Sequence, residues 1–145
     1  MERMGEIREQ LEAFEREHWA EVGQGDDGIE LDRDWPMYMR SDEAGLVHCL
    51  TARVDGHLVG YHISFVTPHP HARRCFSAIV DCYYLSPVCR VGWNGVRFFQ
   101  EAEKSLAERG VQKIFTGTTL RLNNSRILRR LGYRHSEEMY TKVIA

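Results

Sequence analysis

Two titratable side chains lie in apolar runs of the chain, where they could move a proton. Asp81 interrupts the run from Ser77 to Leu85, whose Ile, Val and Tyr residues predict a strand covered on both faces. A carboxylate is costly there unless it is paired, hydrogen-bonded or facing a wet cleft. His62 lies in the strand-like run 57–66, on a small and partly polar face. Both are candidate proton acceptors, and structural roles for both remain the alternatives. The reference pKa of a histidine already lies near neutral pH, whereas the pKa of an aspartate reaches that range only when burial raises it.

The segment after the Asp81 strand has the residues of an anion-binding turn. Ser86-Pro87 ends the strand, because proline cannot donate to a sheet ladder, and a turn with Arg90 and two glycines follows. The next residues predict an amphipathic helix that Gly110 ends in a left-handed conformation. Backbone N–H groups at a helix start favour an anion, and Arg90 adds a permanent cation. The unit 77–110 is therefore predicted to bind a phosphate; the alternative is an ordinary turn with a surface arginine.

The turn and a later segment resemble the motifs of the GCN5-related N-acetyltransferases, the GNAT family. The hexapeptide Arg90-Val91-Gly92-Trp93-Asn94-Gly95 is similar to the family signature Arg/Gln-x-x-Gly-x-Gly/Ala. Its first and last residues match, whereas Trp93 stands where the first signature glycine belongs and Gly92 comes one place earlier. Leu131-Gly132-Tyr133 resembles the end of the closing pattern Leu-Tyr-x-x-Leu-Gly-Phe/Tyr. Leu128 occupies the place at which many members carry the tyrosine that protonates the departing thiolate. The resemblance covers about residues 46–144 and extends to small acetyltransferases encoded by bacteriophages.

This resemblance implies a fold, a cosubstrate and a set of site residues. The fold is α/β, with a mixed and strongly twisted sheet flanked by helices, and acetyl-CoA donates an acetyl group to a primary amine. Asp81 resembles the family's acidic residue that serves, directly or through water, as general base. The Asp81 strand and a strand expected over 111–118 would run parallel and then splay apart, so that the pantetheine arm hydrogen-bonds to exposed backbone. The coenzyme-binding residues implied in this way are Tyr83, Tyr84, Leu85, Arg90, Val91, Gly92, Trp93, Asn94, Gly95 and Asn124.

The length, net charge and cysteine content of the chain limit the class of protein to which it can belong. The 145 residues predict a single domain, with an N-terminal helix and acceptor-side loop over 1–45 and a sheet core over 46–145. A net charge of −2 does not indicate a nucleic-acid or anionic-membrane partner. Four cysteines without metal-like spacing indicate a reducing compartment, and no apolar run is long enough to span a membrane. We expect a cytoplasmic protein, in the host cytoplasm if a phage encodes it. A homodimer is compatible with the sequence.

The N-terminal half contains three further local signals. Apolar spacing predicts a helix over 4–22, in which His18 and Trp19 are interpreted as packing residues. Residues 31–39 are expected to be irregular because of Pro36, with their aromatic side chains over one end of the sheet and, by the resemblance, near the acceptor. Asp55-Gly56 between two strand-like runs predicts a hairpin.

The segments after residue 66 include a predicted loop, a short helix and closing strands. Residues 67–74 are predicted to form a loop, because Pro68 and Pro70 oppose ladder pairing. No metal is expected there, since the loop's two histidines, His69 and His71, lack further ligands. A helix over 126–131 and one or two closing strands over 133–144 complete the prediction.

Two other classes of protein are alternatives to an acetyltransferase. A non-catalytic binding module could keep the fold and engage a host or phage partner, and Trp93 and Leu128 both favour it. A nucleotide-binding α/β domain is poorly supported, because the chain lacks G-x-x-x-x-G-K-[ST] and G-x-G-x-x-G. The sequence leaves the acceptor open among a protein amine, a small-molecule amine and a modified base.

Overall fold

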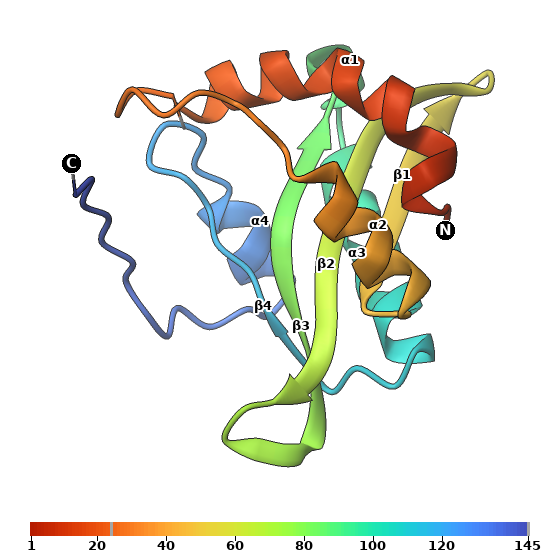
Figure 1. Cartoon of the computed structure of the whole chain (residues 1–145), viewed down its shortest axis with the longest axis vertical. Coiled ribbons are helices and arrows are strands. Elements are labelled where there is room, and N and C mark those ends of the chain that lie inside the picture. The colour runs from red at the N-terminus through yellow and green to blue at the C-terminus, as the bar shows by residue number, and fades with distance from the viewer. Residues whose placement is uncertain (24, 145) are drawn as a thin grey trace.

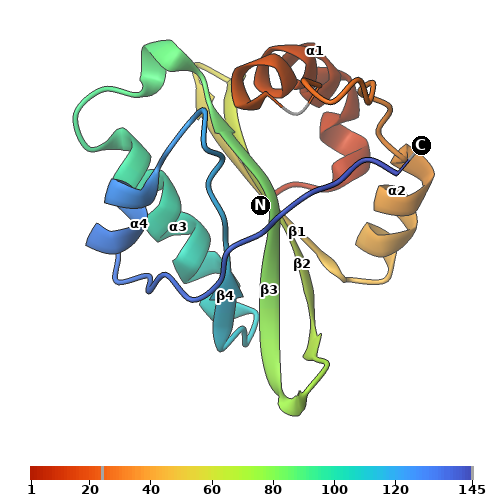
Figure 2. The ribbon, with the colours of Figure 1, turned by 90° about the vertical axis from the view of Figure 1, so that its left-hand side faces the viewer.

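A single mixed sheet lies between two layers of helices (Figures 1 and 2). The computed structural model describes residues 1–23 and 25–144. Helices α1 and α2 cover one face of the sheet and α3 and α4 the other. The elements are α1 (Met4–Val22), α2 (Trp35–Glu43), β1 (Val47–Val54), β2 (His57–His69), β3 (Ala72–Leu85), a short 3-10 turn (Pro87–Cys89), α3 (Asn94–Glu108), β4 (Lys113–Phe115) and α4 (Ser125–Arg130). The predicted α/β architecture is confirmed.

The sheet has the strand order β1-β2-β3-β4, and its first three strands are antiparallel. β4 lies parallel to β3, which makes the sheet mixed. The turn between β1 and β2 has positive φ at both central residues, 48° at Asp55 and 81° at Gly56. Two positive φ values are what the tight hairpin turn requires, so the hairpin prediction is confirmed.

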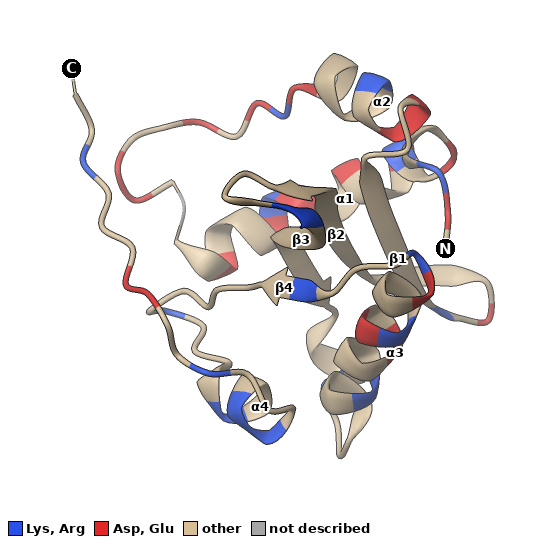
Figure 3. Ribbon diagram, turned by 90° about the horizontal axis from the view of Figure 1, so that it is seen from below, with Lys and Arg blue, Asp and Glu red and all other residues tan. Residues whose placement is uncertain are grey.

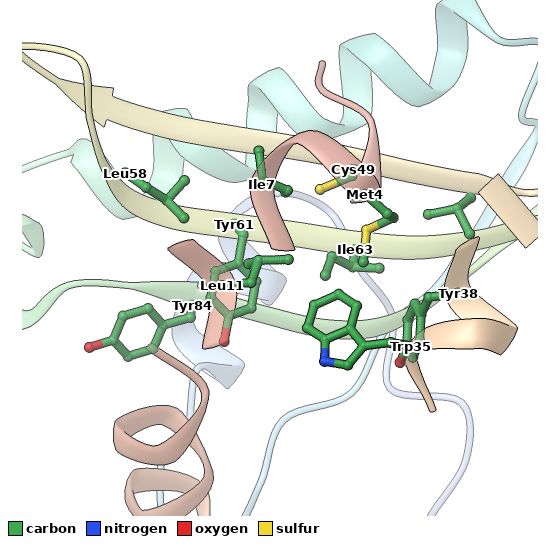
Figure 4. Close-up of a cluster of buried hydrophobic side chains, with 11 residues drawn as sticks. Met4, Ile7, Leu11, Trp35, Tyr38, Cys49, Leu58, Tyr61, Ile63 and Tyr84 are labelled. Atoms are coloured by element: carbon green, nitrogen blue, oxygen red, sulfur yellow. The ribbon is translucent and has the colours of Figure 1, made fainter. Parts of the chain in front are cut away.

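The larger core lies between α1, α2 and the sheet (Figure 4). The apolar stripe of α1 is fully covered, because Met4, Ile7 and Leu11 are each 1% exposed or less. These side chains pack against the face of β2 that carries Tyr61 and Ile63. Burying a side chain of this size stabilises the fold by about 1.5–3 kcal/mol. This packing holds α1 across the end of the sheet where β3 finishes.

α3 covers the opposite face of the sheet. Its stripe of Phe99, Ala102 and Leu106 is buried, and Leu106 packs against Val66 and Ala78. Gly110 follows the helix with a φ of 83°, which confirms the predicted left-handed end. Because successive strand residues alternate between faces, β2 presents Tyr61 to α1 and His62 to α3.

The segment predicted to be irregular over 31–39 contains the start of α2, so that prediction was wrong. Pro36 lies in the first turn of the helix, where a missing N–H costs no hydrogen bond. Asp34 caps the helix, since its carboxylate accepts a hydrogen bond from the Met37 amide at 2.9 Å. Trp35 and Tyr38 are buried, in agreement with their predicted packing over the sheet.

The loop predicted over 67–74 is shorter than expected, because β2 continues to His69 and β3 begins at Ala72. Pro68 pairs in register with Phe76 in spite of its missing N–H. Val66 donates its amide to the carbonyl of Leu46, the residue just before the start of β1. Two residues later, Pro68 directs its nitrogen to the same side, beyond the first residue of β1. The proline therefore removes no ladder hydrogen bond.

The closing strands predicted over 133–144 are absent, since the structure assigns no strand to this segment. The segment runs away from the body of the molecule (Figure 1). Met139 and Tyr140 are 91% and 86% exposed. β4 is only three residues long, so it offers little ladder for another strand. Without a partner strand or a buried face, weak alternation does not specify a strand.

Candidate active site

The edge of β3 beside β4 opens toward its carboxyl end. Parallel pairing with β4 stops at Ile79 and Phe115. Beyond that point no backbone hydrogen bond joins residues 80–85 to residues 116–119 in the described chain. The predicted splay between these two strands is therefore present, although β4 is shorter than the strand expected over 111–118. The backbone of β3 from Val80 onward is left with an unpaired edge.

Asp81 lies where β3 departs from regular pairing. Ile63 pairs with Cys82 and Ser64 with Val80, which makes Asp81 the extra residue of a β-bulge. Bulges redirect side chains and increase the local twist, and they are common beside active sites. The bulge turns Asp81 toward the α1 and α2 side, where its side chain is 31% exposed.

A cavity of about 740 Å³ opens at this point. Its walls come from α1, the segment before α2, α2 itself, β2, the bulged part of β3, the loop after β4 and the C-terminal segment at Met139. It is lined by Glu15, His18, Trp19, Val22, Ile29, Glu30, Leu31, Asp32, Arg33, Asp34, Met37, Tyr38, Tyr61, Val80, Asp81, Cys82, Tyr83, Gly117, Thr118, Thr119, Leu122, Asn124 and Met139. The lining has five carboxylates and one arginine, so the cavity favours a cation. The acidic segment before α2 is visible in Figure 3.

A hydrogen-bonded network fixes the Asp81 carboxylate in the cavity wall. Tyr38 donates its hydroxyl to Asp81 Oδ2 at 2.7 Å, and Arg33 Nη1 lies 3.7 Å from the same oxygen. Arg33 also pairs with Glu15, which is buried. Burial and then Asp81 raise the pKa of Tyr38, so the phenol remains a proton donor. Two carboxylates share one guanidinium, and the network keeps a net negative charge facing the cavity.

His18 also faces this cavity, from the last turns of α1. Its Nδ1 lies 2.7 Å from the Tyr61 hydroxyl, and its ring packs against Tyr84 with the ring centroids 5.2 Å apart. Burial lowers the pKa of His18 to about 4. The sequence interpretation gave His18 a packing role alone. A histidine on the apolar stripe of a helix was the only local signal, and the residue that it meets is 43 positions away.

His62, in contrast, lies on the α3 side of the sheet and does not line the cavity. It is 2% exposed, and its ring is surrounded by those of Tyr83, Phe99 and His48. Burial lowers its pKa to about 4. Of the two predicted bases, the structure brings only Asp81 to the cavity. The small polar face of β2 is covered by a helix instead of lining a cleft.

The start of α3 offers backbone donors, as the sequence indicated. Gly92 has a φ of 57°, a conformation that favours glycine. The Asn94 amide donates to the Val91 carbonyl of the turn, and the Arg97 amide donates to the Trp93 carbonyl at the helix start. In the described chain the amides of Gly95 and Val96 have no protein acceptor. Such donors at the positive end of a helix dipole suit a phosphate.

Arg90 is engaged with protein groups rather than directed at the helix start. Its guanidinium forms a two-pronged ion pair with Glu21 of α1, and its Nε donates to the Leu85 carbonyl at 2.6 Å. It also lies over the Tyr84 ring, 5.4 Å from the centroid. In this structure Arg90 ties the turn after β3 to α1. The sequence had matched it to a signature position but could not reveal Glu21, which is 69 positions away.

The remaining predicted coenzyme residues surround the opening. Tyr83 reaches across it, since its hydroxyl donates to the Gly117 carbonyl at 2.9 Å, and Asn124 Nδ2 lies 3.4 Å from the same hydroxyl. Val91 is exposed in the turn, and Asn94 begins α3 with its side chain on the Cys89 carbonyl. Trp93 is 51% exposed, and the guanidinium of Arg130 stacks on its ring at 3.9 Å.

Leu128 is buried in α4, at the position that the family resemblance assigns to a tyrosine. Its aliphatic side chain cannot donate a proton to a departing thiolate. Among residues 1–23 and 25–144, no three His, Cys, Asp or Glu side chains are grouped as metal ligands. No helix in the same residues is both long and apolar enough to cross a bilayer.

Comparison with known proteins identifies solved structures that share this architecture. No protein-family model matches the chain, and no curated protein matches its sequence. Solved structures do match. A ribosomal-protein-alanine N-acetyltransferase from Brucella melitensis biovar Abortus 2308 superposes with a TM-score of 0.74 at 17% identity, over 97% of this chain and 93% of that one. A predicted acetyltransferase from Clostridium acetobutylicum, solved with acetyl-CoA, gives a TM-score of 0.66 at 14% identity, over 97% and 91%.

A GCN5-related N-acetyltransferase from Ralstonia eutropha JMP134 matches 74% of each chain with a TM-score of 0.60 at 19% identity. The chain has the GNAT fold. At these identities the similarity establishes the architecture, and the activity has to be argued from the residues of this chain. In the GNAT fold of this protein, the acidic cavity is lined by α1 and α2 residues on one face of the sheet, and α3 starts on the opposite face.

Proposed function

We propose that the protein is an N-acetyltransferase that moves an acetyl group from acetyl-CoA to a primary amine. The observation that carries the proposal is the splayed edge of β3, which leads into the acidic cavity at the bulge of Asp81. An extended thioester arm can hydrogen-bond to an unpaired strand edge as an added strand does. A cationic amine is drawn to the carboxylates at the inner end of the same path.

In this proposal, the diphosphate, the pantetheine arm and the thioester of acetyl-CoA each have a candidate binding place. The unpartnered amides of Gly95 and Val96 would take the diphosphate at the start of α3. The pantetheine arm would lie along residues 83–85, as the resemblance implied. The thioester would then lie near the bulge, where the ladder is interrupted and a backbone N–H can polarise its carbonyl. Arg90 would act indirectly, by fixing the turn to α1.

The acceptor reacts as a neutral amine, so a proton has to leave its nitrogen. Asp81, held by Tyr38 and Arg33, would hold and orient the incoming ammonium group. The ammonium group first loses a proton to solvent through the open cavity, and the neutral amine nitrogen then bonds to the thioester carbon. The adduct nitrogen gives up a second proton to a base in the cavity, the carbon–sulfur bond breaks, and the thiolate departs. Since a thiol has a reference pKa near ~8.5, the thiolate can leave without a dedicated acid at the position of Leu128. Holding both reactants in one cavity supplies much of the acceleration.

The test of this function is binding of acetyl-CoA and thiol release. Calorimetric titration should show one acetyl-CoA site, and a panel of amines should contain an acceptor that releases free CoA thiol. Gly95→Glu places a carboxylate at the start of α3, and we expect at least a tenfold loss of acetyl-CoA affinity. Ala107→Glu is the matched control, because it adds the same charge to an exposed site about 18 Å away along α3. Equal affinity in both variants would contradict the coenzyme placement.

A non-catalytic coenzyme-binding module is the second candidate. It is favoured by buried Leu128, which replaces a proton donor, and by the exposed Trp93 with Arg130 on its face. The same measurements separate the two functions. Acetyl-CoA binding without thiol release for any amine in the panel would identify a binding module.

A further inference from the structure

We propose that His18, positioned by Tyr61, is the proton acceptor for the amine in the cavity. The inference rests on the proposed acetyl transfer and names the base for it. It concerns a helix residue that neither the sequence interpretation nor the structural comparisons assign to catalysis.

His18 is placed rigidly at the inner wall of the cavity. α1 is held on the sheet by its buried stripe, and the imidazole projects from that helix between Tyr61 of β2 and Tyr84 of β3. Tyr61 is fully buried, so its hydroxyl is a fixed partner for Nδ1 at 2.7 Å. A proton acceptor has to be held in this way, because small displacements are costly for proton transfer.

The second nitrogen of the ring is the one available for chemistry. Nε2 of His18 has no hydrogen-bond partner in the described chain. It is also not one of the buried side-chain nitrogen and oxygen atoms that lack a partner. Nε2 is therefore open to solvent, and His18 is one of the residues that line the cavity. When Nδ1–H donates to the Tyr61 oxygen, Nε2 carries the lone pair and can accept a proton.

The charges around His18 come from several elements. Glu21 on its own helix and Asp81 on β3 favour the imidazolium, whereas Arg33 from the segment before α2 and Arg90 from the turn after β3 oppose it. Glu15 is paired with Arg33, and the phenols of Tyr61 and Tyr84 remain protonated because burial raises the pKa of each. With burial as the largest effect, the pKa of His18 is lowered to about 4, so the ring is neutral at pH 7. It is then free to accept a proton.

A weak base is adequate at the step where His18 acts. Once the amine nitrogen has bonded to the carbonyl carbon, its N–H is far more acidic than that of the free ammonium group. His18 Nε2 takes this proton as the tetrahedral adduct collapses and the thiolate leaves, and Asp81 and Glu21 stabilise the imidazolium. The proton then passes to solvent through the open cavity. The other two candidates fit less well: Asp81 is bound by Tyr38 and Arg33, and His62 lies on the far face of the sheet.

The test compares two substitutions of His18 with an exposed control. His18→Gln and His18→Ala should each lower kcat by about 10²–10⁴-fold, the usual range for loss of a general base. Acetyl-CoA affinity by calorimetry should stay within about twofold of wild type. His135→Gln changes an exposed histidine and should leave kcat unchanged. Added imidazole should partly restore kcat in His18→Ala, which a merely structural defect would not allow.

Tyr61→Phe provides an independent readout, because it removes only the partner of Nδ1. The apparent pKa of the acidic limb of the kcat/KM profile should shift in Tyr61→Phe and disappear in His18→Gln. Full kcat in a His18→Gln protein that retains the wild-type circular dichroism spectrum would overturn the role of His18 and leave the acetyltransferase function intact. If the wild-type protein binds acetyl-CoA and releases no thiol with any amine, the proposed function fails and the role of His18 fails with it.

Discussion

At the scale of single residues, Gly60 shows how closely β2 and β3 approach beside the candidate coenzyme turn. It pairs with Leu85, the last residue of β3. A Cβ atom at this position would lie 2.7 Å from the Tyr84 carbonyl oxygen and 3.3 Å from the Leu85 Cα. Both are backbone atoms, so neither can move aside as a flexible side chain would. Glycine is required here by close approach and not by a positive φ.

Gly60→Ala should therefore destabilise the protein by about 1–3 kcal/mol, as overpacking does elsewhere. The measurement is the free energy of unfolding from urea denaturation. Gly117→Ala is the matched control, because a Cβ atom there meets nothing within 4 Å and the effect should stay within about 0.5 kcal/mol. Equal stabilities of the two variants would show that the strand ends can separate without cost.

At the scale of elements, α2 depends on a start signal that is easily mistaken for a break. Asp34 before the helix and Pro36 in its first turn are typical of a helix start. The helix is only nine residues long, and its buried Trp35 and Tyr38 hold it on the sheet. Its first turn also carries Tyr38 to Asp81, so the cap supports the cavity wall.

Asp34→Ala removes the side-chain oxygen that accepts the Met37 amide. We expect a loss of about 1 kcal/mol in the free energy of unfolding, the usual value for an N-cap. Asp32→Ala serves as control, since it removes the same charge two residues earlier, at an exposed position. Equal losses in the free energy of unfolding for both variants, measured by urea denaturation, would contradict a capping role of Asp34.

At the scale of the whole molecule, two buried histidines and the half-buried His18 make the fold sensitive to acid. Burial lowers the pKa of His18, His48 and His62 to about 4, from a reference of 6.5. Between these two values the unfolded chain binds protons that the folded chain does not. Stability is therefore complete above the unfolded pKa and falls as the pH decreases toward 4.

We expect the free energy of unfolding to be lower at pH 5 than at pH 7, by about 2 kcal/mol for each of the fully buried His48 and His62. Urea denaturation at both pH values measures this difference. His62→Gln should reduce the pH dependence, whereas replacing the exposed His57 with Gln should leave it unchanged. Stability that does not vary between pH 7 and pH 5 would contradict neutral, buried histidines.

Local sequence patterns were sufficient for several elements of the fold. The helical spacing of Met4, Ile7 and Leu11 predicted α1, and Asp55-Gly56 predicted the hairpin between β1 and β2. The strand, turn and helix over 77–110 followed from one apolar run, a proline and well-placed glycines. These signals depend on neighbours within a few residues, which is why they can be read without the fold. The roles of the predicted coenzyme residues stay predictions.

The tertiary structure alone decided which side chains share the cavity. Tyr38 and Asp81, like His18 and Tyr61, are 43 positions apart, and they meet because strand register and helix packing bring them together. The bulge at Asp81 turned that carboxylate toward the cavity, while the alternation along β2 turned His62 beneath α3. A one-residue change of pairing would reverse these faces, and the bulge at Asp81 is itself such a local change of register. The sequence thus determined the elements and the kinds of residue available, and the packing of α1 across the sheet determined which histidine faces the cavity.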